Sequence, residues 1–117
     1  ELEDMGKSQR RELESRFMVL LAHLLKWQFQ LNQLNSQFKE FEGKSWRKTI
    51  IEQRAQILYL LDDMPSLKRE LETAMLKIYP QAVLFAVEET GLKKTVFPEN
   101  CPYTIEQLLN KQFYPTH

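Results

Sequence analysis

Two side chains, His23 and Arg54, have the chemistry for catalysis or ligand binding. A histidine titrates near neutral pH, so His23 could act as a general base. Arg54 lies four residues after Ile50 and three before Ile57, so on a helix it shares the face of these apolar residues. A guanidinium on such a face keeps its charge and needs a carboxylate or several carbonyls as partners. Both residues are therefore candidates for a functional site.

Each of these residues also has a structural interpretation. His23 is surrounded by leucines one helical turn before Trp27, where a histidine is usually a hydrogen-bonded residue at or near the core. For Arg54 we expect an ion pair that fixes the register of its helix, with Glu14 as its partner. A guanidinium that faces a ligand is the alternative.

A second group combines one aromatic ring with three cations, at Lys44, Trp46, Arg47 and Lys48. Such a cluster could hold phosphates while Trp46 stacks on a base. The chain has sixteen basic and sixteen acidic residues, so it has no net field that attracts nucleic acid. We therefore favour Trp46 as a core anchor and the three cations as the solvated start of a helix.

Cys101 is the single cysteine, which excludes an internal disulfide and favours a reducing, cytoplasmic setting. It lies near the predicted start of the last helix, whose dipole could favour a thiolate and a redox function. A small buried hydrophobic residue is the simpler interpretation. No His/Cys pair has the spacing of metal ligands, and His117 ends the chain, so we expect neither a metal nor a cofactor. The apolar runs at 17–22 and 82–87 are too short to span a bilayer.

The elements that must position these residues are predicted to be helices, because glycine is sparse and apolar residues recur at helical spacing. The first helix is expected from near the start to Leu31. A second apolar stripe beside its main one indicates a central helix with neighbours on more than one side. The main stripe consists of Leu13, Phe17, Leu20, Leu24, Trp27 and Leu31.

The second helix is predicted to begin at Ser45, whose hydroxyl could cap the first turn. Residues 32–44 are mostly polar and are expected to form a long connection before it. A sharp turn is expected at 62–66. Pro65 would then occupy the first position of the third helix, where its missing N–H has no cost.

The third helix is predicted to end at Gly91, a residue suited to a left-handed C-cap. Pro80 lies inside it and should kink it, and two shorter helices broken at Pro80 are the alternative. Thr104 and Gln107 have the spacing of a capping box at the start of a short final helix. The expected fold class is all-α: one domain over 1–117, a small bundle of three long amphipathic helices plus a short C-terminal helix.

Several short motifs follow one another through nearly the whole chain. They are the run from Met5 to Gln28, Ser45-Trp46-Arg47 continuing to Arg54, Pro65-Ser66-Leu67, Glu89-Thr90-Gly91-Leu92, Phe97-Pro98 and Cys101-Pro102-Tyr103-Thr104. In this order they resemble the bacterial "domain of unknown function 29" family, which is abundant in cyanobacteria. The resemblance implies a helical bundle. It implies no activity, because the function of that family is not established.

The resemblance also marks motif positions for testing, which are Arg10, Glu14, His23, Trp27, Trp46, Arg47 and Arg54. Two features depart from the family pattern. From the resemblance we expect the chain to lack the N-terminal helical segment that members usually carry, and we expect the stretch between Gln30 and Ser45 to be longer than usual.

Because no catalytic or metal-binding constellation outweighs its structural interpretation, we expect a cytoplasmic, non-enzymatic interaction or regulatory module. Its partner would be another protein or a second copy of the chain, and no membrane is expected. The alternative is a metal-independent nuclease or nucleic-acid-binding protein. In that alternative Arg10, Arg47 and Arg54 would hold phosphate, His23 would exchange protons and Trp46 would stack on a base.

Overall fold

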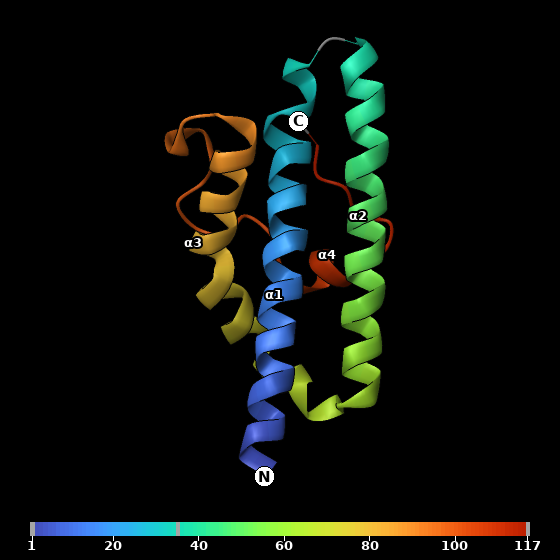
Figure 1. The fold of residues 1–117 in the computed structure, drawn as a ribbon, viewed down its shortest axis with the longest axis vertical. Coiled ribbons are helices and arrows are strands. Elements are labelled where there is room, and N and C mark those ends of the chain that lie inside the picture. Colours follow the sequence, from blue (N-terminus) through green and yellow to red (C-terminus); the bar gives the residue numbers. More distant parts are fainter. Residues whose placement is uncertain (1, 35, 117) are drawn as a thin grey trace.

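The computed structural model describes residues 2–34 and 36–116, and their side chains except those of residues 2–5, 32 and 36. Three long helices stand side by side: α1 (Leu2–Phe29), α2 (Ser36–Asp63) and α3 (Leu71–Thr90) (Figure 1). α1 lies between α2 and α3. The short helix α4 (Ile105–Leu109) packs against α2 and α3. The predicted all-α bundle is confirmed.

α1 is the central helix, as its two apolar stripes predict. The side chains of Leu20, Leu21, Leu24 and Leu25 are all fully buried, which requires packing partners on both sides of the helix. α1 ends at Phe29, slightly earlier than expected, and a single 3-10 turn, η1 (Leu31–Gln33), follows it.

The expected long connection over 32–44 is wrong, because α2 begins at Ser36. Ser45 therefore lies inside α2 and does not cap it. Most side chains between these serines belong to good helix formers, and an ion pair of 3.9 Å joins Glu40 to Lys44 across one helical turn. Because this stretch has few buried apolar residues, the spacing of apolar residues could not predict that it is helical.

The turn after α2 differs in detail from the prediction. Pro65 occupies the first position of a 3-10 helix, η2 (Pro65–Glu70), rather than of α3. α3 begins only at Leu71. The first position of either helix type tolerates a residue without an N–H. Pro65 therefore occupies the first position of a helix, as expected, but that helix is η2 and not α3.

α3 continues without interruption through Pro80, so the alternative of two shorter helices is wrong. Gly91 ends α3 in the left-handed region, with φ of 72°, and its N–H donates to the carbonyl of Val87. Only glycine adopts this backbone conformation at no steric cost. The predicted C-cap is confirmed.

The chain returns through a 3-10 turn, η3 (Lys94–Val96), to α4. The capping box is confirmed: Thr104 Oγ1 accepts from the Gln107 N–H at 3.1 Å, and Gln107 Oε1 accepts from the Thr104 N–H at 2.9 Å. Leu108 of α4 is fully buried and ties this short helix to the core. Among the described residues, no helix is long and apolar enough to cross a membrane.

Candidate functional site

A cleft of about 520 Å³ opens between the C-terminal half of α1, the N-terminal half of α2 and the C-terminal end of α3. It contains two of the residues singled out by the sequence, His23 and Trp46. The residues that line it are His23, Lys26, Gln30, Leu34, Phe38, Glu42, Ser45, Trp46 and Glu89.

Helical spacing brings these side chains together. His23, Lys26 and Gln30 follow one another at intervals of three and four residues, so they share one face of α1. Phe38, Glu42 and Ser45 do the same on α2. The connection between the two helices is short, so α1 and α2 run antiparallel and the two faces meet (Figure 1).

Lys26 and Glu89 form an ion pair that joins α1 to α3 at this cleft. The Lys26 side chain is only 6% exposed, whereas that of Glu89 is 40% exposed. The Lys26 ammonium also lies 5.8 Å from the ring centroid of Trp46 and 5.7 Å from that of Phe85. A buried ammonium needs such partners, since it would otherwise lose its hydration without compensation.

His23 is held in one tautomer by the backbone of its own helix. Its Nδ1 lies 2.8 Å from the carbonyl oxygen of Val19. Because a carbonyl can only accept, Nδ1 carries the proton and the neutral ring keeps its lone pair on Nε2. Burial, and then the nearby charge of Lys26, lowers the pKa of His23. His23 is therefore neutral at pH 7 and supplies a hydrogen-bond acceptor to the cleft.

The charges that line the cleft do not cancel. Among the described residues that line it, Lys26 is the single cation, and Glu42 and Glu89 are two carboxylates. Glu89 neutralises Lys26, while Glu42 makes no ion pair within the described part of the chain. The cleft is thus negative and rich in acceptors, with the lone pair of His23 and the hydroxyl of Ser45 beside the carboxylates.

A second group of predicted site residues gathers around Tyr114 in the C-terminal segment. The Tyr114 ring lies 5.0 Å from the ring of Trp27, centroid to centroid. The guanidinium carbons of Arg47 and Arg54 lie 5.0 Å and 5.4 Å from the centroid of the same ring. These contacts hold the end of the chain against α1 and α2.

The expected ion pair between Arg54 and Glu14 is wrong. Arg54 is 1% exposed, and it donates from Nε to the Leu108 carbonyl at 2.8 Å and from Nη2 to the Gln107 carbonyl at 3.2 Å. Glu14 instead lies 3.1 Å from Lys77 on α3. Carbonyls in the last turn of a helix lack partners within that helix, so Arg54 satisfies the end of α4.

The remaining polar candidates lie apart from the cleft. Arg10 is 3.6 Å from Glu70, in an ion pair between α1 and η2. Arg54 is not among the residues that line the cleft, so the structure does not bring it together with His23 in one cavity. Trp46 is 7% exposed, which confirms it as a core anchor, and Arg47 is exposed.

Cys101 packs against the core, and its Sγ lies 3.6 Å from the carbonyl of Tyr103. Burial raises the pKa of the Cys101 thiol, the opposite of what a reactive thiolate requires. Among the described residues, no group of three or more His, Cys, Asp and Glu side chains could hold a metal ion. His117 lies outside the described residues.

Sequence reasoning missed Lys26, Glu42 and Glu89 of the cleft, and Tyr114. Lys26 could have been found by the argument used for Arg54, because it lies four residues after Ala22, which is fully buried. Glu89 could not, because its partner Lys26 is 63 residues away in the sequence. Such a pairing depends on how helices assemble, which periodicity does not determine.

A comparison with known families identifies the chain. The family model described as "Domain of unknown function DUF29" matches residues 1–114. No curated protein and no solved structure matches the sequence. Since the matched region covers nearly the whole chain, the protein belongs to the DUF29 family.

Proposed function

We propose that this domain is a non-enzymatic interaction module that binds a basic side chain of a protein partner in the cleft. One observation carries the proposal: two carboxylates face a single cation there, and that cation is already paired. Lysine and arginine side chains have only hydrogen-bond donors at their charged ends, and the cleft offers mainly acceptors.

The electrostatics of the cleft favour such a ligand. Glu42 has no paired cation within the described residues, and the exposed part of Glu89 faces the same opening. A concave site with an excess of one sign of charge concentrates ions of the opposite sign. A cation between Glu42 and Glu89 could also donate a hydrogen bond to Nε2 of the neutral His23.

The apolar walls match the rest of a basic side chain. Leu34 and Phe38 provide a surface for the methylene groups of lysine or arginine, which commonly lie along apolar surfaces while the charge stays in a polar site. Trp46 already has one ammonium near its ring face, that of Lys26. A second cation placed at the aromatic rim would gain a similar attraction.

The experiment is an NMR titration of the protein with N-acetylarginine amide, with N-acetylcitrulline amide as the uncharged control of the same shape. We expect saturable shifts at the Trp46 indole N–H and the His23 ring with arginine only, in the millimolar range that a single charged contact supports. Glu42→Gln should weaken the response at least several-fold. Glu88→Gln, which removes an exposed carboxylate outside the cleft, should not.

Two results would contradict the proposal. Equal responses to arginine and citrulline would show that charge is not recognised. Shifts confined to residues outside the cleft would show that the compound binds elsewhere.

We infer further that the protein works in the bacterial cytoplasm. The single cysteine, Cys101, allows no internal disulfide, which suits a reducing compartment. The resemblance noted above points to bacteria, and to cyanobacteria in particular. Fractionation of a native host with an antibody against the protein would test this setting, and recovery outside the cytoplasm would contradict it.

A further inference from the structure

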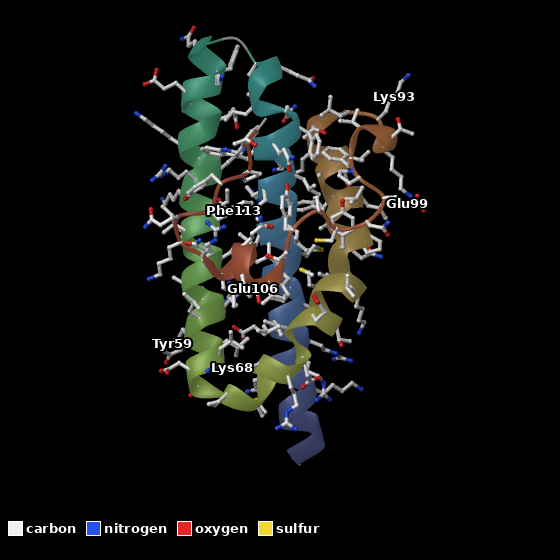
Figure 2. The ribbon with its side chains drawn as sticks, turned by 180° about the vertical axis from the view of Figure 1, so that it is seen from behind. Tyr59, Lys68, Lys93, Glu99, Glu106 and Phe113 are labelled. Carbon is white, nitrogen blue, oxygen red and sulfur yellow. The ribbon has the colours of Figure 1, made fainter. Side chains whose placement is uncertain are left out.

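The outer face of α2, opposite its buried stripe, is exposed along most of its length. Its central residues are spaced four, three, four, three and four apart, the spacing of a coiled-coil seam about 27 Å long. Figure 2 shows Tyr59 projecting outward from this helix. The residues of this outer seam, all exposed, are Phe41, Ser45, Lys48, Glu52, Ala55 and Tyr59.

The outer seam is symmetric in chemistry about position 50. Aromatic rings stand at its two ends, where Phe41 is 70% exposed and Tyr59 is 72% exposed. Small residues, Ser45 and Ala55, stand inside them. Near its middle the seam carries opposite charges, at Lys48 and Glu52.

We propose that a second copy of this chain packs on the outer seam, with the two α2 helices antiparallel. Around a twofold axis at position 50, Phe41 faces Tyr59 of the second copy and Lys48 faces Glu52 of the second copy. Symmetry produces every such pair twice. Ser45 then faces Ala55 of the second copy, and two small residues allow the helices to approach closely.

The charges select this arrangement over the alternatives. A parallel pair would place Lys48 against Lys48 and Glu52 against Glu52, which repel. An antiparallel pair shifted by one heptad would place Phe41 against Glu52, or Lys48 against Tyr59. Only the register centred on position 50 pairs the aromatic rings with each other and each cation with an anion.

Lys48 and Glu52 are available for these contacts. They stand four residues apart on α2, yet they make no ion pair with each other in the described chain. Lysine before glutamate is also the weaker order for a pair of this spacing on one helix. Neither charge is therefore engaged in an ion pair within the described chain, and the second copy supplies a partner of opposite charge for each.

This inference is independent of the proposed function. Glu42 and Glu89, which carry the charge of the cleft, do not belong to the outer seam, and only Ser45 is shared by both surfaces. A protein that self-associates and ignores arginine would contradict the proposed function alone. A monomer that binds arginine in the cleft would contradict the present inference alone.

The test is sedimentation equilibrium of the wild type, K48E, E52K, the double variant K48E/E52K, and an equal mixture of the two single variants. We expect the wild type to dimerise reversibly and each single variant to associate at least about tenfold more weakly, since like charges then meet twice. The double variant and the mixture should both regain association, because each restores two opposite-charge pairs.

Two controls separate this result from general effects of charge or folding. Lys93→Glu reverses a charge on the other side of the molecule from α2 and should leave the dimer unchanged (Figure 2). Circular dichroism should show the same helix content for all variants. A wild type that stays monomeric at millimolar concentration overturns the proposal. Association of the mixture, without association of the wild type or of the double variant, also overturns it, because that is the result expected for a parallel pair of helices.

Discussion

Lys26 of α1 and Glu89 of α3 form an ion pair beside the cleft, and the lysine side chain is almost completely removed from water. The two residues are far apart in the sequence, so this contact fixes how α3 sits against the central helix. The pair also sets the charge of the cleft, because it neutralises the one cation there. The two partners differ in burial, since the side chain of Glu89 remains partly exposed to solvent whereas that of Lys26 does not.

Glu89→Gln is expected to lower the free energy of unfolding by about 1–2 kcal/mol, because it leaves the Lys26 ammonium without its counter-charge. The value lies below that of a fully buried pair because water reaches Glu89. Urea denaturation measures it. Adding Lys26→Met to this substitution should recover part of the loss, since the unpaired buried ammonium is then removed. A loss of the same size for the exposed neighbour, Glu88→Gln, would contradict a specific role for the pair.

Arg54→Met is expected to lower the free energy of unfolding by about 2–4 kcal/mol. The substitution removes the Arg54 donors from the carbonyls of Leu108 and Gln107, of which Gln107 still accepts from the Asn110 N–H, and it removes one cation from the Tyr114 ring. Hydrogen exchange should accelerate first in α4. Arg47→Met, which alters an exposed cation on the same ring, is the matched control and should change stability far less. Equal effects of the two substitutions would show that the carbonyl contacts matter little.

Stability should fall as the pH is lowered from 7 to 5, in part because of His23. The folded protein lowers the pKa of His23 below its usual value near 6.5, so the unfolded chain takes up a proton at a higher pH than the folded one. The contribution of His23 is thus complete above about pH 6.5 and is lost as the pH falls through the lowered pKa. Urea denaturation across this range should show a shallower dependence for His23→Gln. Parallel curves for the two proteins would contradict the assignment.

Two serine and threonine substitutions distinguish a true helix cap from a false one. Thr104→Ala is expected to destabilise the protein by about 1 kcal/mol, because it removes the acceptor of the Gln107 N–H. Ser45→Ala should be neutral or slightly stabilising, since Ser45 lies inside α2 and alanine is the better helix former. Thermal unfolding of both variants measures the difference. A comparable loss for Ser45→Ala would show that α2 begins later than Ser36.

Glycine substitutions give a similar contrast. Gly91→Ala is expected to cost about 1 kcal/mol, because the left-handed backbone at this C-cap disfavours any side chain. Gly43→Ala should stabilise α2 by up to about 1 kcal/mol, because the added methyl would meet Leu31 at an ordinary 3.7 Å. Chemical denaturation compares the two. Stabilisation by Gly91→Ala would contradict the C-cap.

The elements that follow from local sequence were predictable. The central position of α1 follows from its paired leucine stripes, and the ends at Gly91 and Thr104 follow from residues whose conformational preferences act within one turn. The start of α2 was not predictable from apolar spacing, because its first turns bury little. The helical conformation of these first turns of α2 depends on the helix propensity of residues such as Glu40 and Lys44.

The candidate site was predictable only in part. His23 and Trp46 were recognisable as unusual residues at helical positions, and they do line one cleft. The partner of Arg54 was not recognisable, because the carbonyls that it binds belong to α4, more than fifty residues later. Contacts of this kind arise from the way the helices pack together, which the local spacing of residues in the sequence does not reveal.

The central place of α1 has a mechanical consequence. α2 and α3 each pack along α1 and barely touch one another directly, and the short elements η2 and α4 contact both of them (Figure 1). The cleft, bordered by Glu42 of α2 and Glu89 of α3, spans these two outer helices. A cation bound between those carboxylates would add a further link between α2 and α3, so ligand binding should reduce the relative motion of these two helices.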